Sequence, residues 1–285
     1  MLLDNEVKRC YNTAYAFFSK KGAFMCKCQK NTSLSHLYIY HYLKLAFRIL
    51  LFLVALVYYI VSKIESTPLP FGDPDAHAIF WGIVWVFFFT GMVLRIFPSK
   101  LETIGCQKQL KRNYVPTGEE KPSLTPTKSL VVFTLCWVAL NLVFGILYLT
   151  SVIDAGILML LSLAYGVCDI VCILFFCPIR DWFLKNKCCA DCRIYNWDYA
   201  MMFTPLFFIP HVYTWSLLGL GLFLLILWEI MYKLHPERFA KNTNASLMCQ
   251  NCKEKPCRHK KRIAKILEQS KEKLAKLSWW HHPKK

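Results

Sequence analysis

The sequence predicts an all-α integral membrane protein, and two observations lead to this prediction. The chain is 55% hydrophobic, yet it carries a formal net charge of +17. Its apolar residues gather in long runs, and its basic residues gather in the short segments between these runs. Such separation is expected where lipid surrounds one part of a chain and water the other. We therefore expect about five to six transmembrane or re-entrant helices, a cytoplasmic cysteine-rich metal-binding region and a basic amphipathic C-terminal helix.

The N-terminal segment, residues 1–42, is polar or mixed in character and rich in lysine. It holds no early apolar run of the kind found in a cleavable signal peptide. We expect it to lie on the cytoplasmic side, and the first spanning helix to act as its own insertion signal.

Four apolar runs follow, each long enough to cross about 30 Å of hydrocarbon at a rise of about 1.5 Å per residue. The predicted spans are 43–62, 77–97, 130–152 and 156–177. Three basic side chains near the polar ends of the first two spans, Lys44, Arg48 and Arg95, are expected to extend their charged groups to the membrane interface. Only Ile153, Asp154 and Ala155 separate the last two spans, which predicts a tight helical hairpin.

The connections between the spans differ in charge, and this difference predicts their direction. Lysine and arginine are concentrated before the first span, between the second and third, and after the fourth, whereas the other two connections are acidic. Cytoplasmic connections carry the excess of basic residues, so the N-terminus is expected on the cytoplasmic side of the cell membrane.

The acidic connections contain no cysteine. Thiols kept to the reducing side suggest metal ligands or free thiols rather than disulfides.

The last apolar stretch, residues 200–232, is too long for one simple span and short for two. Pro205 and Pro210 interrupt its first half, and His211 precedes an unbroken apolar run. A single crossing would place the strongly basic tail outside, against the orientation rule. We therefore predict a short proline-broken segment at 201–210 followed by a full helix that returns the chain to the cytoplasm, so that both termini are cytoplasmic.

Two cytoplasmic segments carry cysteines at metal-ligand spacing. The predicted ligands are Cys188, Cys189 and Cys192 in the loop at 178–199, and Cys249, Cys252, Cys257 and His259 in the tail at 233–285. Each segment includes a C-x-x-C pair, and two such pairs can complete a tetrahedral four-thiolate site. That site suits a structural zinc ion and an iron–sulfur cluster about equally. Separate free thiols, or a redox-active C-x-x-C, are the alternative reading.

A carboxylate inside the fourth span, Asp169, is the first candidate for a functional group within the membrane. Burying a charge in hydrocarbon is costly, so such a residue is by default a functional candidate. The alternative is a structural hydrogen bond between helices, to Asn141 or Thr90. Asp198 and His211 are the other catalytic candidates, in the loop and at the start of the last helix.

The loop after the fourth span also combines charged and aromatic side chains at the expected membrane face. Arg180, Arg193 and Trp197 would suit the headgroup of a lipid or a quinone-like carrier, although aromatic residues at that depth also form ordinary interfacial belts. Further along, residues 258–280 read as a basic amphipathic helix that rests on anionic inner-leaflet lipids. Nucleic acid binding is disfavoured because no base-reading motif is present.

Three classes of function fit these features, and whether the protein is an enzyme stays open. The first is electron transfer between a cytoplasmic iron–sulfur centre and a lipid-soluble carrier, with a soluble redox partner. The second is a transporter or membrane transferase in which structural zinc ties the loop to the tail. The third is a non-catalytic scaffold. The expected protein partner is a soluble redox protein or a second copy of the chain in a homo-oligomer. The identity of the metal separates the first class from the others.

Overall fold

The computed structural model describes most of the membrane-embedded part of the chain. The described residues are 36–65, 74–97, 106–119, 121–124, 127–184, 192–248, 250–252, 260, 262–263, 265–266 and 269–270. All of them belong to the second of two units of the chain, Leu34–Lys285. The predicted N-terminal segment therefore lies almost entirely outside the described residues.

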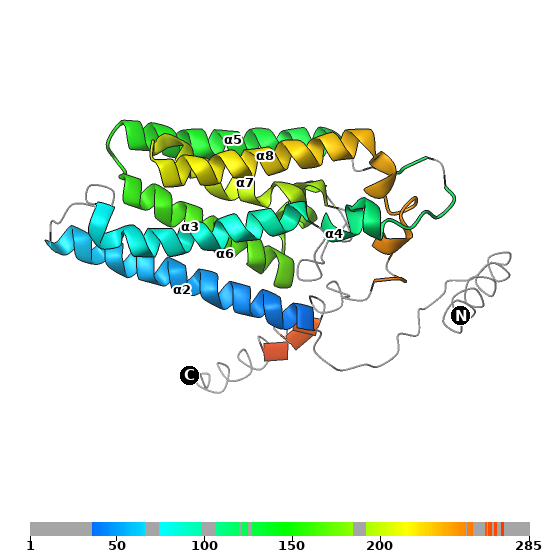
Figure 1. Cartoon of the computed structure of the whole chain (residues 1–285), viewed down its shortest axis with the longest axis horizontal. Coiled ribbons are helices and arrows are strands. Elements are labelled where there is room, and N and C mark those ends of the chain that lie inside the picture. Colours follow the sequence, from blue (N-terminus) through cyan, green and yellow to red (C-terminus); the bar gives the residue numbers. More distant parts are fainter. Residues whose placement is uncertain are drawn as a thin grey trace, which may run out of the picture. The chain divides into compact units, whose positions relative to one another are not determined.

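The described part of the chain contains five long helices that lie side by side (Figure 1). They are α2 (His36–Glu65), α3 (Pro74–Ile96), α5 (Thr127–Leu149), α6 (Ala155–Leu174) and α8 (Val212–Leu234). All but α3 are long and apolar enough to cross a membrane, and α3 contributes an apolar helical stretch at Trp81–Ile96. These helices confirm the predicted class, a multi-pass helical membrane protein.

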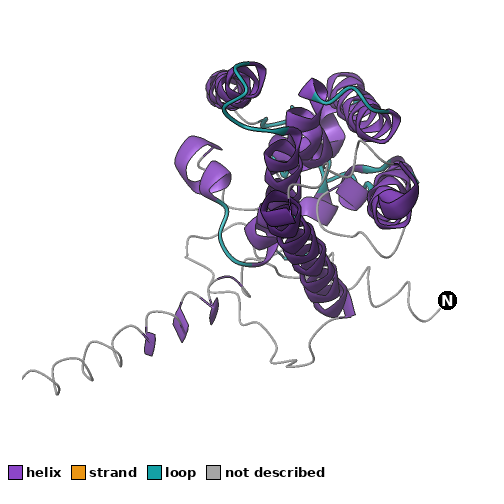
Figure 2. Cartoon of the chain, turned by 90° about the vertical axis from the view of Figure 1, so that its left-hand side faces the viewer, coloured by secondary structure: helices purple, strands orange, loops and turns teal. Residues whose placement is uncertain are grey.

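Shorter helical elements occupy the connections. They are α4 (Cys106–Gln109), η1 (Lys111–Asn113), η2 (Ile179–Leu184), η4 (Arg193–Trp197), α7 (Asp198–Phe203), η5 (Thr204–Phe208), η6 (Pro236–Arg238) and η7 (Ala245–Leu247). Figure 2 shows the chain coloured by helix and loop. Among the described residues, the only extended pairing is one isolated bridge between Pro116 and Asn244.

The helix bounds differ from the predicted spans where polar residues extend or cap a helix. Helix α2 begins at His36 rather than Leu43, because its first turns bury Tyr38 against α6 residues such as Ile173. Helix α6 begins at Ala155, where the Asp154 side chain accepts a hydrogen bond from the Ile157 N–H at 3.0 Å. Such capping satisfies a backbone donor that has no partner within the helix.

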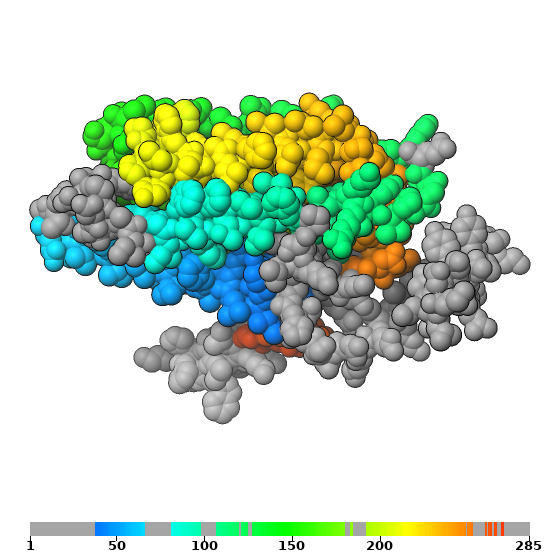
Figure 3. Space-filling model, viewed as in Figure 1, coloured from blue at the N-terminus to red at the C-terminus, as the bar shows by residue number. Residues whose placement is uncertain are grey.

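Helix α6 is the most enclosed of the candidate spans, with 44% of its apolar window buried against 22% for α5. It packs closely along α2 and also contacts α7 and η5. The outer faces of α5 and α8 expose large apolar residues such as Leu135 and Phe223, as expected for surfaces that meet lipid. Figure 3 shows α8, α3 and α2 as three adjacent bands on one face.

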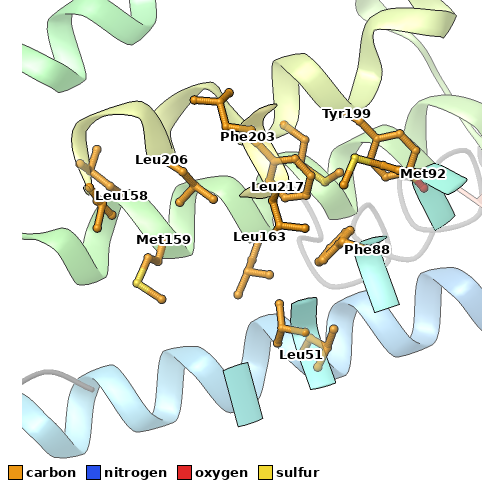
Figure 4. Packing of buried hydrophobic residues seen from close by; sticks show 14 of the residues in the cluster. Leu51, Phe88, Met92, Leu158, Met159, Leu163, Tyr199, Phe203, Leu206 and Leu217 are labelled. Atoms are coloured by element: carbon orange, nitrogen blue, oxygen red, sulfur yellow. The ribbon is translucent and has the colours of Figure 1, made fainter. Parts of the chain in front are cut away.

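The main apolar core lies between α2, α3, α6 and α8. Phe88 and Met92 of α3 and Leu158 of α6 are almost completely buried there. Figure 4 shows these side chains with Phe203 of α7 and Leu217 of α8 converging on one interior. The core therefore includes the short α7 as well as long helices.

The predicted proline-broken segment corresponds to α7 and η5, followed by α8. The six residues of α7 and five of η5 rise by about 19 Å, less than the roughly 30 Å of the hydrocarbon layer. The Ser162 hydroxyl of α6 donates to the Met202 carbonyl at 2.7 Å, and Tyr199 approaches Gly91 of α3 and Gly221 of α8. This short segment is thus surrounded by protein, the condition under which a broken helix is tolerated at membrane depth.

The chain after α8 folds back onto the connection between α3 and α5. Asn244, which is fully buried, donates to the carbonyls of Lys108 at 3.1 Å and Arg238 at 2.8 Å. The Ala245 N–H donates to the Val115 carbonyl at 2.8 Å. These two basic connections therefore lie at the same end of the bundle.

We call this end, with the start of α2 and α5 and the last turns of α3, α6 and α8, the charged end. The opposite end carries the turn between α5 and α6 and the start of α8, and we call it the hairpin end. The assignment of the charged end to the cytoplasm remains a prediction from the basic residues.

Candidate functional site

Two arginine–carboxylate pairs are buried near the charged end of the bundle. Arg48 of α2 reaches Asp169 of α6, with 2.8 Å between Nη1 and Oδ2, and the side chains are 1% and 13% exposed. Arg95 of α3 makes a two-pronged ion pair with Asp198, the first residue of α7. The prediction that the two arginines extend to the membrane interface is therefore wrong. Each has a carboxylate close by, and pairing offsets part of the cost of a charge inside the bundle.

Further contacts hold both guanidinium groups in place. Arg48 donates to the Gly166 carbonyl of α6 and lies 5.3 Å from the centre of the Phe88 ring. Arg95 lies 4.6 Å from the centre of the Tyr199 ring, a distance at which a cation is attracted to an aromatic face. The alternative partner considered for Asp169, Asn141, instead donates to a carbonyl of its own helix.

The two pairs form one electrostatic group. Asp198 interacts with Arg95 and also, at longer range, with Asp169 and Arg48. Asp198 precedes the last candidate span, and burial raises the pKa of its carboxyl above the ordinary value although Arg95 acts in the opposite direction.

A cavity of about 140 Å³ lies beside these pairs, between α5, α6, η4 and α7. Asp169 and Asp198 both form part of its wall. The remaining wall is mostly apolar, aromatic or sulfur-containing. It includes the rings of Trp137, Tyr165 and Tyr195, the thiols of Cys168, Cys172, Cys177 and Cys192, and the side chains of Ile173, Ile179, Ile194, Met201 and Met202. A mostly apolar cavity with a few converging polar groups is the usual form of a small-molecule site.

Two polar atoms on the cavity-lining residues are buried without a hydrogen-bond partner among the described residues. They are the Tyr165 hydroxyl and the Trp137 indole N–H. The two rings lie with their centres 4.7 Å apart. Buried polar groups are nearly always paired, so these two donors are exceptions within the described residues.

A third charged cluster lies next to the cavity. Arg193 donates to Glu229 of α8 through Nε at 2.9 Å, and Trp197 donates to the same carboxylate at 2.8 Å. The Arg193 guanidinium also stacks over Tyr232, 4.0 Å from the ring centre. These predicted headgroup residues, Arg193 and Trp197, therefore contact Glu229 and are not part of the cavity wall. The side chain of Arg180 lies outside the described residues.

His211 is far from this group in the fold. It lies at the hairpin end, where its Nδ1 accepts a hydrogen bond from the Tyr213 N–H at 3.3 Å and so caps α8. The structure thus brings the candidates Asp169 and Asp198 to one cavity and leaves His211 at the other end of α8.

The predicted metal ligands fall mostly outside the described residues, which exclude Cys188, Cys189, Cys249, Cys257 and His259. The two described ligands have separate surroundings. Cys192 is buried among apolar side chains such as Phe133, and the Cys252 sulfur lies 3.5 Å from the Lys108 Nζ. Within the described ranges, no group of three or more His, Cys, Asp or Glu residues is arranged to hold a metal ion. The shared metal centre therefore remains a prediction.

Sequence reasoning missed the arginines as members of the site, although a signal for them was present. Arg48 and Asp169 lie in two different spans, both a few turns from the basic ends. Opposite charges at similar depths in neighbouring spans are expected to pair, since a lone charge there is costly. No comparable signal identified Trp137 or Tyr165.

No protein-family model matches this chain, and neither the curated proteins nor the solved structures contain a significant match to it.

Proposed function

We propose that this protein binds the headgroup of a lipid-soluble, quinone-like carrier in the cavity beside Asp169 and Asp198 and exchanges electrons with it. The observation that supports this proposal most directly is the composition of the cavity wall. Aromatic rings, aliphatic side chains and two carboxylates surround one space at the end of an apolar helical bundle.

The size of the cavity suits a single ring. Its volume of about 140 Å³ is close to the roughly 150 Å³ of a protein cavity that holds benzene. The Trp137 and Tyr165 rings offer stacking surfaces to such a ring. The isoprenoid or alkyl tail of the carrier would extend into lipid.

The buried charges support proton-coupled chemistry at the same place. Reduction of a quinone to a hydroquinone consumes two electrons and two protons. Asp169 and Asp198 lie in the cavity wall, and the arginines Arg48 and Arg95 balance their negative charge. A carboxyl in hydrogen-bond reach of a reacting oxygen can act as a general acid or base.

The second electron carrier of this proposal is the predicted cytoplasmic metal centre, in the form of an iron–sulfur cluster. Cluster ligation by Cys188, Cys189, Cys192, Cys249, Cys252 and Cys257 would place it next to the charged end. Anaerobically purified protein should then contain iron and acid-labile sulfide and be brown. A colourless protein with stoichiometric zinc would remove electron transfer through a cluster from the proposal.

A transporter or membrane transferase is the second candidate, favoured by one specific observation. Helix α7 and the proline-containing η5 form an interrupted element beside the cavity, with Asp198 at its start. Interrupted helices commonly form the binding sites of transporters, where they expose backbone groups to the substrate. In a transporter or transferase, zinc would only tie the loop to the tail. In the remaining alternative, a non-catalytic scaffold, the cavity would bind no substrate.

The proposal is tested by titrating the full-length protein, in lipid nanodiscs, with a short-chain benzoquinone. Binding is followed by quenching of tryptophan fluorescence. We expect Asp169→Asn to weaken binding by about tenfold, because one charge-assisted hydrogen bond contributes roughly 1.4 kcal/mol or more. Trp137→Phe should reduce the amplitude of the quenching.

Asp154→Asn is the matched control, because Asp154 is also paired with a cation, Lys63, but lies at the hairpin end. It should leave the affinity unchanged. Equal affinities of the wild type and Asp169→Asn, or no binding by the wild type, would contradict the proposed function.

A further inference from the structure

The cavity beside Asp169 and Asp198 reaches the outer surface of the bundle at Cys168 of α6. Among the described residues that line the cavity, Cys168 is the only one that is exposed. It is also the only exposed residue in α6, all of whose residues are described. Other parts of the wall are closed, because Ile173 and Met202 are buried. The cavity therefore has a lateral opening at Cys168.

The paths of α5 and α6 explain why an opening lies there. Although a short turn joins the two helices, α5 packs against η2 and η5 rather than closely against α6. The two helices diverge from their turn toward the charged end (Figure 1). Trp137 of α5 and Tyr165 of α6 bridge the gap between them, with their ring centres 4.7 Å apart. Cys168 follows Tyr165 by three residues, so it lies on the same face of α6 and nearer the charged end.

The opening lies at the depth of the hydrocarbon layer. Helix α6 has 20 residues, enough to cross about 30 Å of hydrocarbon. Cys168 precedes the last residue of α6, Leu174, by about 9 Å along the helix axis. At the level of Trp137, the outer surface of α5 exposes the apolar side chains of Leu135 and Val138. A molecule dissolved among the acyl chains can thus reach the opening without passing through water.

The size of the cavity makes such an opening necessary for a ligand that carries a tail. The volume of about 140 Å³ is filled by one ring, since a protein cavity of roughly 150 Å³ holds benzene. A long alkyl or isoprenoid tail must then lie outside the cavity. The small side chain of Cys168 narrows the passage less than a large apolar side chain would.

Packing against lipid does not by itself account for Cys168. A cysteine on a membrane helix usually serves as a small apolar side chain. Cys136 of α5 is of this kind, because it is exposed and is absent from the described cavity wall. Cys168 differs from Cys136 because it belongs to both the outer surface and the cavity wall.

We infer that the carrier enters the cavity from the bilayer through the opening at Cys168, between α5 and α6, and that its tail stays in this opening in contact with lipid. The inference rests on the proposed function and narrows the ligand to an amphiphile with a long apolar tail. The ring would lie against Trp137 and Tyr165, and the tail would pass Cys168 into hydrocarbon. A small quinone that arrives from water would not need this route.

The first experiment uses the full-length protein in lipid nanodiscs and a benzoquinone whose decyl tail carries a photoreactive diazirine. After illumination, the labelled residues are mapped by mass spectrometry. We expect labels on α6 around Cys168 and on α5 around Trp137, and at least tenfold less label there in the presence of excess unlabelled decyl benzoquinone. Binding of the quinone without label at these positions would overturn the inference and leave the proposed function standing. Absence of quinone binding would overturn both.

A phosphatidylcholine with the same photoreactive group in its acyl chain distinguishes the carrier from a bound lipid. Its label around Cys168 should fall at least tenfold when excess decyl benzoquinone is added. Its label at Phe223, which is exposed on α8, should not change. Label around Cys168 that decyl benzoquinone does not reduce would mean that a lipid chain fills the opening, which would overturn the inference.

The second experiment compares two variants by quinone titration. Cys168→Trp should fill the opening, and we expect it to raise the Kd for decyl benzoquinone at least tenfold more than the Kd for a short-chain benzoquinone. Cys136→Trp is the matched control and should change neither Kd. Equal losses of affinity for the two quinones in Cys168→Trp would overturn the inference, because the new side chain would then act on the ring and not on the tail. Photolabelling of the wild type keeps the result independent of how well the variants fold.

Discussion

Each end of the helical bundle contains an ion pair between a basic side chain and an aspartate, and the two pairs differ in how deeply they are buried. At the charged end, Arg95 and Asp198 form an ion pair whose side chains are 3% and 7% exposed. At the hairpin end, Lys63 and Asp154 also form an ion pair, at 2.6 Å, but their side chains are 54% and 25% exposed. Because exposed ion pairs contribute little and a buried charge without its partner is costly, we expect the two pairs to differ in their effect on stability.

The hairpin end is held together mainly by close packing instead. Phe208 of η5 packs directly over Gly145 of α5, and Tyr59 of α2 packs over Gly156 of α6. Small residues allow helices and rings to approach closely, which is a common source of stability in membrane bundles. Substitutions at the two ends should therefore differ both in magnitude and in how they can be compensated.

The largest effect is expected when one partner of the buried pair is removed. Arg95→Met leaves the Asp198 carboxylate buried without its cation, and we expect a loss of about 3–5 kcal/mol in the free energy of unfolding. The measurement is a denaturant titration of the purified protein followed by circular dichroism. Lys63→Met at the exposed pair is the control and should not change the unfolding midpoint.

The double variant Arg95→Met/Asp198→Leu sharpens this test. It removes both charges and leaves apolar side chains of similar size, so most of the lost stability should return. If the double variant were as unstable as Arg95→Met, the instability would come from lost packing around Tyr199 and not from an unpaired charge.

An intermediate effect is expected at the hairpin end from Gly145→Ala. A methyl group at Gly145 would overlap the Phe208 ring, and relief of such overlap typically costs about 1–3 kcal/mol. The same denaturant titration measures it. Gly219→Ala is the matched control, because Gly219 lies within α8 and nothing lies near its added methyl group.

The control should raise stability slightly, by about 0.5–1 kcal/mol, since alanine favours a helix over glycine. Similar losses for Gly145→Ala and Gly219→Ala would mean that helix flexibility, and not contact with Phe208, is what the glycines provide.

The smallest effect is expected from a single neutral hydrogen bond. The Trp85 indole N–H of α3 donates to the Ser216 hydroxyl of α8 at 2.7 Å. Such bonds between membrane helices contribute about 0.6 kcal/mol on average, so Ser216→Ala should have an effect of this size. A double-mutant cycle with Trp85→Phe measures the coupling energy between the two side chains. A value above about 2 kcal/mol would contradict the expectation, because this hydrogen bond would then contribute nearly as much to stability as a buried ion pair.

The long helices could be predicted from the sequence because a helix that crosses a membrane must be apolar over about 20 residues. Apolar runs therefore predicted α5, α6 and α8 with errors of a few residues at their ends. The early start of α2 was missed because Tyr38 and His41 are buried by contacts in the folded protein and are not part of an apolar run. Hydropathy does not report such contacts.

The site was only partly predictable for a related reason. Asp169 and Asp198 could be found because a carboxylate near or inside a span is unusual. Their partners Arg48 and Arg95 were assigned to the interface. Opposite charges at similar depths suggested pairing, but a single sequence does not show which spans lie side by side. The cavity depends on where α6 ends, which a run of apolar residues does not reveal.

The short segment formed by α7 and η5 has a consequence for how the protein is made. A stretch this short is not recognised as a spanning helix when the chain enters the membrane. Its contacts come from helices on both sides of it in the chain: Gly91 and Ser162 before it, and Gly221 after it. We therefore expect the long helices to be inserted first and this segment to take its place only once synthesis has passed α8, so that assembly of the cavity is the last step in the biogenesis of the bundle.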